Sequence, residues 1–266
     1  MKENERNKGQ VQSVAKAMEL LELLLRARQP MSLQELCAAG GYPKSTVHGL
    51  LSTLRAYDMV RQEGDGRYAL GIRLYECGCA VSARWNVKQA ARPWLEQLAQ
   101  ELGTGTVLAM RSGTQALCVD RCAAGTGTGP QVTVEEGIRL PLHATAPGKL
   151  LLSMDSEAEL RRYLREPGLT PFTRHTLTDP EALSRELAGI RQTGFAVEDG
   201  EYRVGLRAVA APVYEADGVP RYTLGAMGLF PRVQSEEFQY AIARTLQAAA
   251  HLSAELGYGG AYRNSL

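Results

Sequence analysis

The chain has 266 residues, of which 44% are hydrophobic and 22% are charged, values close to those of average globular proteins. This composition excludes intrinsic disorder, a coiled-coil rod and a collagen-like fibre as the main structure. Its 30 Lys and Arg residues balance 29 Asp and Glu residues, so no strong overall charge attracts the chain to nucleic acid or membranes. The length suggests roughly two domains. Residues 1–75 are mildly basic, with 11 Lys and Arg residues against 8 Asp and Glu residues.

The sequence gives no sign of export or membrane insertion. No segment approaches the ~20 apolar residues of a membrane-spanning helix, and the polar first ten residues are unlike a signal peptide. Five cysteines, an odd number in a long chain, favour reduced thiols over a disulfide scaffold. We therefore expect a cytoplasmic protein without a membrane partner.

The N-terminal part predicts three successive helices. Ser13 stands at an N-cap position, and the apolar residues Val14, Met18, Leu21 and Leu25 follow at helical spacing. A second, short helix is expected from the capping-box pair Ser32 and Glu35 to the glycines at 40 and 41. A third is expected from Lys44 to about Tyr57, with Pro43 in its first turn.

Two short extended runs, 59–62 and 67–70, flank a Gly-Asp-Gly turn and predict a hairpin. Three helices followed by a hairpin indicate a winged helix-turn-helix domain over residues 10–72. Residues 73–84 are expected to form a linker helix that can transmit conformational change. The region 85–257 mixes strands with segregated helices, which indicates an α+β domain. Its expected strands are 106–110, 117–121, 131–135, 208–214 and 222–229.

If the third helix enters the major groove of DNA, the residues of its first turns reach base edges and phosphates. Lys44 can neutralise a phosphate, and hydroxyl groups can donate to phosphate oxygens. A simpler interpretation is a polar, well-capped helix start, and His48 alone is typical of a surface residue. The candidate DNA-binding residues are Tyr42, Lys44, Ser45, Thr46, His48 and Gly49, with Arg67 in the wing.

Three motifs make the resemblance to a known family specific. The runs YPKSTVHGLLSTLRAYDMV and GRYALGIRLYECG resemble the "pKSTvhRLLxtL" recognition helix and closing "YxLG" of the IclR family of bacterial transcription regulators. Downstream, GIRLPLHATAPGKLLLS resembles "G.rlPLHatA.GKalLA", and TGFAVEDGEYRVGLRAVAAPVYEADG resembles "G.a.d.eE...G...iaaPv.d..G". In the same order, these motifs cover about residues 10–257. The resemblance implies a winged helix-turn-helix, a linker helix and a GAF-like effector domain that form dimers or tetramers on double-stranded DNA operators.

One position departs from the family pattern. Gly49 stands where the family usually has an arginine in the recognition helix. The change removes a phosphate or guanine contact, and a helical glycine costs roughly 1 kcal/mol relative to alanine. Our hypothesis is that this glycine allows a close approach of the backbone to DNA.

The resemblance also implies an effector pocket between one sheet face and the helices that cover it. The free N–H groups at the helix opened by Gly148 would favour the carboxylate of a small organic acid. Gly and Ala on the far wall leave room, and Met is an adaptable lining, so we expect a partly apolar acid such as an aromatic carboxylate. Ordinary core packing is the competing interpretation. The candidate effector-binding residues are Thr145, Ala146, Gly148, Leu206, Ala208, Gly225 and Met227.

Other signals point to no further chemistry. The acidic residues Glu198, Asp199 and Glu201 are expected to form a solvated turn, with contacts at the edge of the pocket or a bound cation as alternatives. The glycine run 125–129 lacks the context of a phosphate loop. The cysteines have no metal-ligand spacing and are expected to pack as small apolar residues, with thiol sensing as an alternative. We expect no catalytic residues, no cofactor and no metal.

The sequence thus predicts a DNA-binding regulator, expected to act as a repressor, whose operator affinity responds to a small organic acid. The alternative is a small-molecule-binding or hydrolytic enzyme whose N-terminal domain serves assembly. Binding to a palindromic operator that weakens with salt favours the regulator, and turnover of a ligand favours the enzyme.

Overall fold

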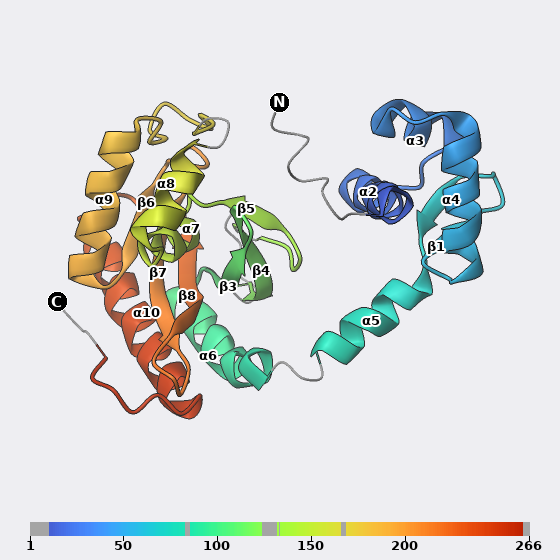
Figure 1. Cartoon of the computed structure of the whole chain (residues 1–266). Helices are drawn as coiled ribbons and strands as arrows, with labels where there is room; N and C mark the ends of the chain where they lie inside the picture. The colour runs from blue at the N-terminus through green and yellow to red at the C-terminus, as the bar shows by residue number, and fades with distance from the viewer. Residues whose placement is uncertain (1–10, 83–85, 124–131, 133, 166–168, 263–266) are drawn as a thin grey trace. The chain divides into compact units, whose positions relative to one another are not determined.

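The structure is a computed structural model. It describes residues 11–82, 86–123, 132, 134–165 and 169–262. These residues form two compact units, one that ends before residue 86 and one that begins at it (Figure 1).

The first unit has the order expected of a winged helix-turn-helix. It consists of α2 (Gln12–Ala27), α3 (Leu33–Gly40), α4 (Lys44–Ala56), β1 (Val60–Gln62), β2 (Tyr68–Leu70) and α5 (Ile72–Ser82). The predicted capping box is present: the Ser32 side chain accepts from Glu35 N, and the Glu35 carboxylate accepts from Ser32 N. The two strands pair antiparallel, from Val60 opposite Leu70 to Gln62 opposite Tyr68. The predicted third helix and hairpin are confirmed.

The start and the exposed face of α2 differ from the sequence prediction. The N-cap is Val11 and not Ser13, and no side chain caps this helix. Leu20, Leu21 and Leu24 enter the core of the unit. Of the apolar residues predicted at helical spacing, only Leu21 is buried, whereas Val14, Met18 and Leu25 are exposed. We call these three residues the α2 stripe.

The second unit is the predicted mixture of helices and antiparallel strands. Its elements are α6 (Asn86–Leu102), β3 (Gly105–Ser112), β4 (Gln115–Cys122), β5 (Arg139–Pro141), α7 (Ala146–Ser153), α8 (Glu157–Arg165), α9 (Pro180–Thr193), β6 (Ala196–Asp199), β7 (Arg207–Tyr214), β8 (Pro220–Gly228) and α10 (Glu236–Glu255). The strand order is β5-β4-β3-β8-β7-β6, and every neighbouring pair is antiparallel.

Helices cover both faces of this sheet (Figure 1). The long helices α6 and α10 pack on one face, through α6 with β3 and β4 and through α10 with β7 and β8. The short helix α7 packs on the other face and is itself covered by α9. Side chains alternate along each strand, so Val107, Ala208 and Met227 join the core on the α7 side. We call this side the α7 face.

Two strands were missed by the sequence analysis, and one prediction was misplaced. Within the predicted strand 131–135, residues 131 and 133 lie outside the described part of the chain, and the described Val132, Val134 and Glu135 belong to no strand. The edge strand is β5, which pairs from Pro141 opposite Gln115 to Arg139 opposite Leu117. β5 has three residues and β6 four, too few to show an alternating pattern.

Candidate functional site

The outward face of α4 carries most of the candidate DNA-binding residues. Lys44, Ser45, His48 and Gly49 are exposed, while Val47 and Leu51 bury the opposite face in the core of the unit. Ser52, one turn beyond His48, is exposed on the same side and was not singled out from the sequence. Helical spacing aligns these residues into one polar surface the length of two turns.

The N-terminus of α4 is open to an anion. Its N-cap is Pro43, and among the described residues no side chain caps the first turn. The first turn also contains no acidic residue. The good cap assumed by the simpler interpretation is therefore absent from the described residues, and the first-turn N–H groups can bind a phosphate together with Lys44.

Tyr42 contacts its own unit through both its hydroxyl and its ring. Its hydroxyl donates to the Glu19 carboxylate of α2, which raises the pKa of the tyrosine. The Lys16 ammonium lies 5.1 Å from the ring centroid. These contacts fix α2 against the turn that precedes α4.

Arg67 of the wing is also held within the unit. Its guanidinium donates to the carbonyl of Pro30 at 3.1 Å and to Glu35 at 3.3 Å. It also lies 3.7 Å from Asp65. The side chain is half-exposed, so a phosphate contact would have to share the guanidinium with these partners.

The seven candidate effector residues lie in or beside the core on the α7 face. Ala208 pairs directly with Met227, and Gly225 pairs with Ala210 on one side and Val107 on the other. Leu206, Ala208 and Met227 are buried in the same core cluster as Ala146. The sequence thus selected residues that the fold brings onto one surface, although they are densely packed there.

Backbone packing leaves no space for a side chain at two of the glycines. A β-carbon at Gly225 would lie 2.8 Å from the carbonyl oxygen of Val209. At Gly148 it would lie 2.5 Å from the carbonyl oxygen of Pro141. Gly225 therefore permits close contact between β8 and β7, and Gly148 permits close contact between α7 and the end of β5. Substitution of either glycine would disturb the fold and so could not test ligand binding.

The N–H groups at the start of α7 already have acceptors, contrary to the sequence expectation. Thr145 caps the helix: its hydroxyl oxygen accepts from Gly148 N at 3.1 Å and donates to the carbonyl of Pro141 at 2.9 Å. The backbone N–H of Ala146 donates to the Glu198 carboxyl group, which also accepts from Tyr202 N at 3.1 Å. A side chain of the protein itself occupies the position expected for an acid ligand.

The acidic segment 198–201 is not the solvated turn that the sequence predicted. Glu198 and Glu201 are buried, and only Asp199 is exposed. Burial raises the pKa of Glu198 to about 8, with the neighbouring Glu201 charge adding to the effect. Burial also raises the pKa of Glu201. The reason is tertiary: β6 places Glu198 opposite Ala208 on the covered face of the sheet.

Lys149 of α7 neutralises part of this buried charge. Its ammonium nitrogen lies 2.6 Å from Glu201 and 2.9 Å from Glu186 of α9, and its side chain is only 1% exposed. The sequence analysis did not single out Lys149, although a lysine within the apolar run of a short helix is the signal that could have done so. The ammonium charge of Lys149 lowers the pKa of Glu198, but burial and the neighbouring Glu201 charge raise it more.

Neither His143 nor Cys118 is arranged for nucleophilic catalysis. Both ring nitrogens of His143 have other partners, the Tyr163 hydroxyl and the Thr170 carbonyl, each at 3.0 Å. Burial raises the pKa of Cys118 to about 12, the opposite of the shift that an activated thiol needs. Among the other cysteines, Cys77 and Cys79 are exposed, so the packing role expected for them is wrong.

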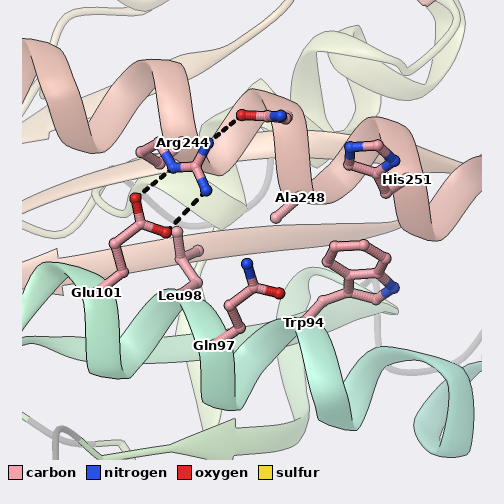
Figure 2. A pocket seen from close by; sticks show the side chains of 8 residues that line it. Trp94, Gln97, Leu98, Glu101, Arg244, Ala248 and His251 are labelled. Atoms are coloured by element: carbon pink, nitrogen blue, oxygen red, sulfur yellow. Dashed lines mark hydrogen bonds and ion pairs between the residues drawn. The ribbon is translucent and has the colours of Figure 1, made fainter.

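A shallow groove lies on the other side of the sheet, between α6 and α10 (Figure 2). Its volume is about 60 Å³. The rings of Trp94 and His251 stack along one end, 4.9 Å apart and nearly parallel. At the other end, Arg244 donates to the Glu101 carboxylate at 2.8 Å. No site was predicted here from the sequence, because these residues are far apart in the chain.

The described residues contain no group of three His, Cys, Asp or Glu side chains suited to a metal ion. Among their helices, none combines the length and the apolar character that a membrane crossing requires.

Comparisons with known proteins identify the family. The model of the IclR helix-turn-helix domain matches residues 13–64, and the model of the C-terminal part of the bacterial transcriptional regulator IclR matches residues 79–254. The chain belongs to the IclR family. It is therefore a DNA-binding transcriptional regulator, and in this family such regulators respond to a ligand.

Individual relatives agree with this assignment. The chain is 32% identical to the HTH-type transcriptional regulator XynR of Escherichia coli, over 93% of this chain and 98% of the relative. It is 30% identical to the transcriptional repressor IclR of the same species, over 95% and 92%. A solved IclR homologue from Microbacterium hydrocarbonoxydans, in complex with 4-hydroxybenzoate, is 24% identical with a TM-score of 0.79, over 92% and 98% of the two chains.

Proposed function

We propose that this IclR-family regulator is a cytoplasmic repressor that binds a double-stranded operator through α4 and is controlled by a small organic acid. The observation that carries the DNA-binding part is the open N-terminus of α4, which has neither a side-chain cap nor an acidic residue. Beside it, Lys44, Ser45 and His48 form an exposed polar surface. The repressor names among the relatives support the sign of regulation.

The effector site proposed here is the α7 face. Ala208, Gly225 and Met227 would form its wall, with Leu206 beside them and Thr145, Ala146 and Gly148 at the start of α7. Their common location on one sheet face supports this assignment. The complex of one family member with 4-hydroxybenzoate supports an aromatic acid as the ligand class. Because these residues are packed and Glu198 occupies the start of α7, binding requires α7 and the sheet to separate slightly and the effector's acid group to displace the Glu198 side chain.

Self-association is part of the proposal. The α2 stripe exposes Val14, Met18 and Leu25 on one side of a helix, and α5 exposes Ile72 and Tyr75. Exposed apolar residues at helical spacing favour a helix-to-helix contact between copies. A dimer would present two α4 helices to two half-sites about one DNA turn, roughly 34 Å, apart.

We propose no enzymatic activity. The thiol of Cys118 has a raised pKa, and the ring nitrogens of His143 are both engaged, so neither is prepared for nucleophilic attack.

A gel shift with the purified chain on its own promoter region tests the proposal. We expect specific binding that weakens with salt and is released by one member of a panel of aromatic and aliphatic acids. Specific binding that no acid changes would contradict the effector class. Binding that does not distinguish the promoter from unrelated DNA would contradict the operator.

A further inference from the structure

A hydroxyl group without a hydrogen-bond partner is buried on the α7 face. Thr223 of β8 is 0% exposed, and within the described residues its Oγ1 has no partner. A hydroxyl group loses its hydrogen bonds to water when it is buried, and proteins nearly always replace them. A buried, unpaired hydroxyl beside a candidate binding site is therefore a position where a ligand can supply the missing bond.

The position of Thr223 associates it with the proposed effector site. Successive side chains of a strand point to opposite faces of the sheet, so every second residue shares a face. Thr223 therefore lies on the same side of β8 as Gly225 and Met227. Its register partners are Ala109 of β3 and Pro212 of β7. Neither side chain has a polar group that could pair with the hydroxyl, so the hydroxyl remains available.

The two ends of this strand segment differ in chemistry. Met227 pairs with Ala208, and Ala208 pairs with Glu198, so one end adjoins the start of α7 and the buried carboxyl groups. Thr223 lies four residues away, about 13 Å along the strand. This span accommodates one aromatic ring with a polar group at each end.

We propose that Thr223 binds a second polar group of the effector, at the end of the ligand opposite its acid group. The inference rests on the proposed effector site and deepens it: the ligand is an aromatic acid that carries a hydroxyl or a similar group far from the carboxylate. Thr223 then selects this ligand over the same acid without the second group.

The chain offers a matched control for testing this role. Thr245 of α10 is also 0% exposed, and its Oγ1 likewise has no partner within the described residues. It belongs to the helix that packs on the opposite face of the sheet. Thr223→Val and Thr245→Val each replace a hydroxyl by a methyl group of similar size.

The experiment measures the binding of 4-hydroxybenzoate and of benzoate to the full chain and to both variants by calorimetry. We expect Thr223→Val to weaken the binding of 4-hydroxybenzoate about tenfold and to leave benzoate unchanged. Thr245→Val should change neither. Thermal melts should show that Thr223→Val is at least as stable as the original chain, because an unpaired hydroxyl is removed.

Three outcomes overturn the inference. In the first, Thr223→Val weakens both acids equally or weakens neither, which leaves the acid effector intact but removes the role of Thr223. In the second, Thr223→Val lowers the melting temperature, which reveals a partner for the hydroxyl within the folded chain. In the third, the original chain binds neither acid, and then the proposed effector class fails as well.

Discussion

The ammonium nitrogen of Lys149 lies 2.6 Å from Oε1 of Glu201, and both side chains are buried between α7 and the loop after β6. The second oxygen of Glu201 has no hydrogen-bond partner within the described residues. The ion pair therefore compensates the burial of Glu201 only in part. It joins α7 to the segment that also holds Glu198, so charge at this position affects both stability and the proposed effector site.

We expect Lys149→Met to lower the free energy of unfolding by about 3–5 kcal/mol, because it leaves the Glu201 carboxylate buried without a counter-charge. The double variant Lys149→Met with Glu201→Leu should recover most of the loss, because it removes both charges. Urea denaturation of both variants measures the difference. A single variant that loses less than about 1 kcal/mol would show that water reaches Glu201.

Glu198→Gln should change how stability depends on pH. Burial raises the pKa of Glu198 from its ordinary 4.5 to about 8. Between these values the folded chain keeps a proton that the unfolded chain releases, so rising pH destabilises the original chain by about 1.4 kcal/mol per unit. Above about pH 8 this dependence ends.

The glutamine variant has no such proton, so its stability relative to the original chain should increase from pH 5 to pH 8. Urea denaturation of both proteins at several pH values measures this difference. The other groups of the cluster, Lys149, Glu201 and Glu186, remain in both proteins and cancel in the comparison to first order. Parallel stability curves would mean that Glu198 is ionised throughout.

Gly49→Ala separates helix stability from DNA contact. A β-carbon at Gly49 meets no atom within 4 Å, so alanine should stabilise the first unit by roughly 1 kcal/mol. If the backbone approaches DNA closely at Gly49, the same variant should bind the operator more weakly. Gly49→Arg, the family residue, should tighten binding if only a missing contact matters. Thermal melts and gel shifts measure both effects, and operator affinities that neither variant changes would exclude a role for this position.

Lys44→Ala should weaken binding to every operator sequence tested, because one phosphate contact is lost. It should also reduce the slope of log affinity against log salt concentration by about 1. Arg161→Ala is the matched control, since Arg161 is an exposed cation of α8 in the second unit. It should leave the slope unchanged. Equal slopes for all three proteins, measured by fluorescence anisotropy across a salt series, would remove Lys44 from the interface.

Met18→Glu tests self-association through the α2 stripe. Met18 is 54% exposed in the single chain, and a charge there should dissociate a helix-to-helix contact at micromolar concentration. Leu229→Glu is the control, because Leu229 is 53% exposed but lies after β8 in the second unit. Analytical ultracentrifugation should show a smaller species for Met18→Glu alone. The same mass for both variants would place the contact elsewhere.

The sequence by itself determined the order of elements in the first unit and the family. Long helices with periodic apolar residues, the Ser32–Glu35 capping box and the hairpin turn are local signals, and local interactions produce them. The same signals placed Lys44, Ser45 and His48 on α4, where exposure depends mainly on helical spacing.

Only the tertiary structure decided the environment of the buried charges and polar groups. Glu198 belongs to an acidic run that looks solvated, yet pairing of β6 with β7 turns it onto the covered face of the sheet. Lys149 and Glu201 are 52 residues apart in the chain and meet only when α7 packs on that face. Burial and pairing between distant residues depend on long-range packing, which residue spacing does not encode.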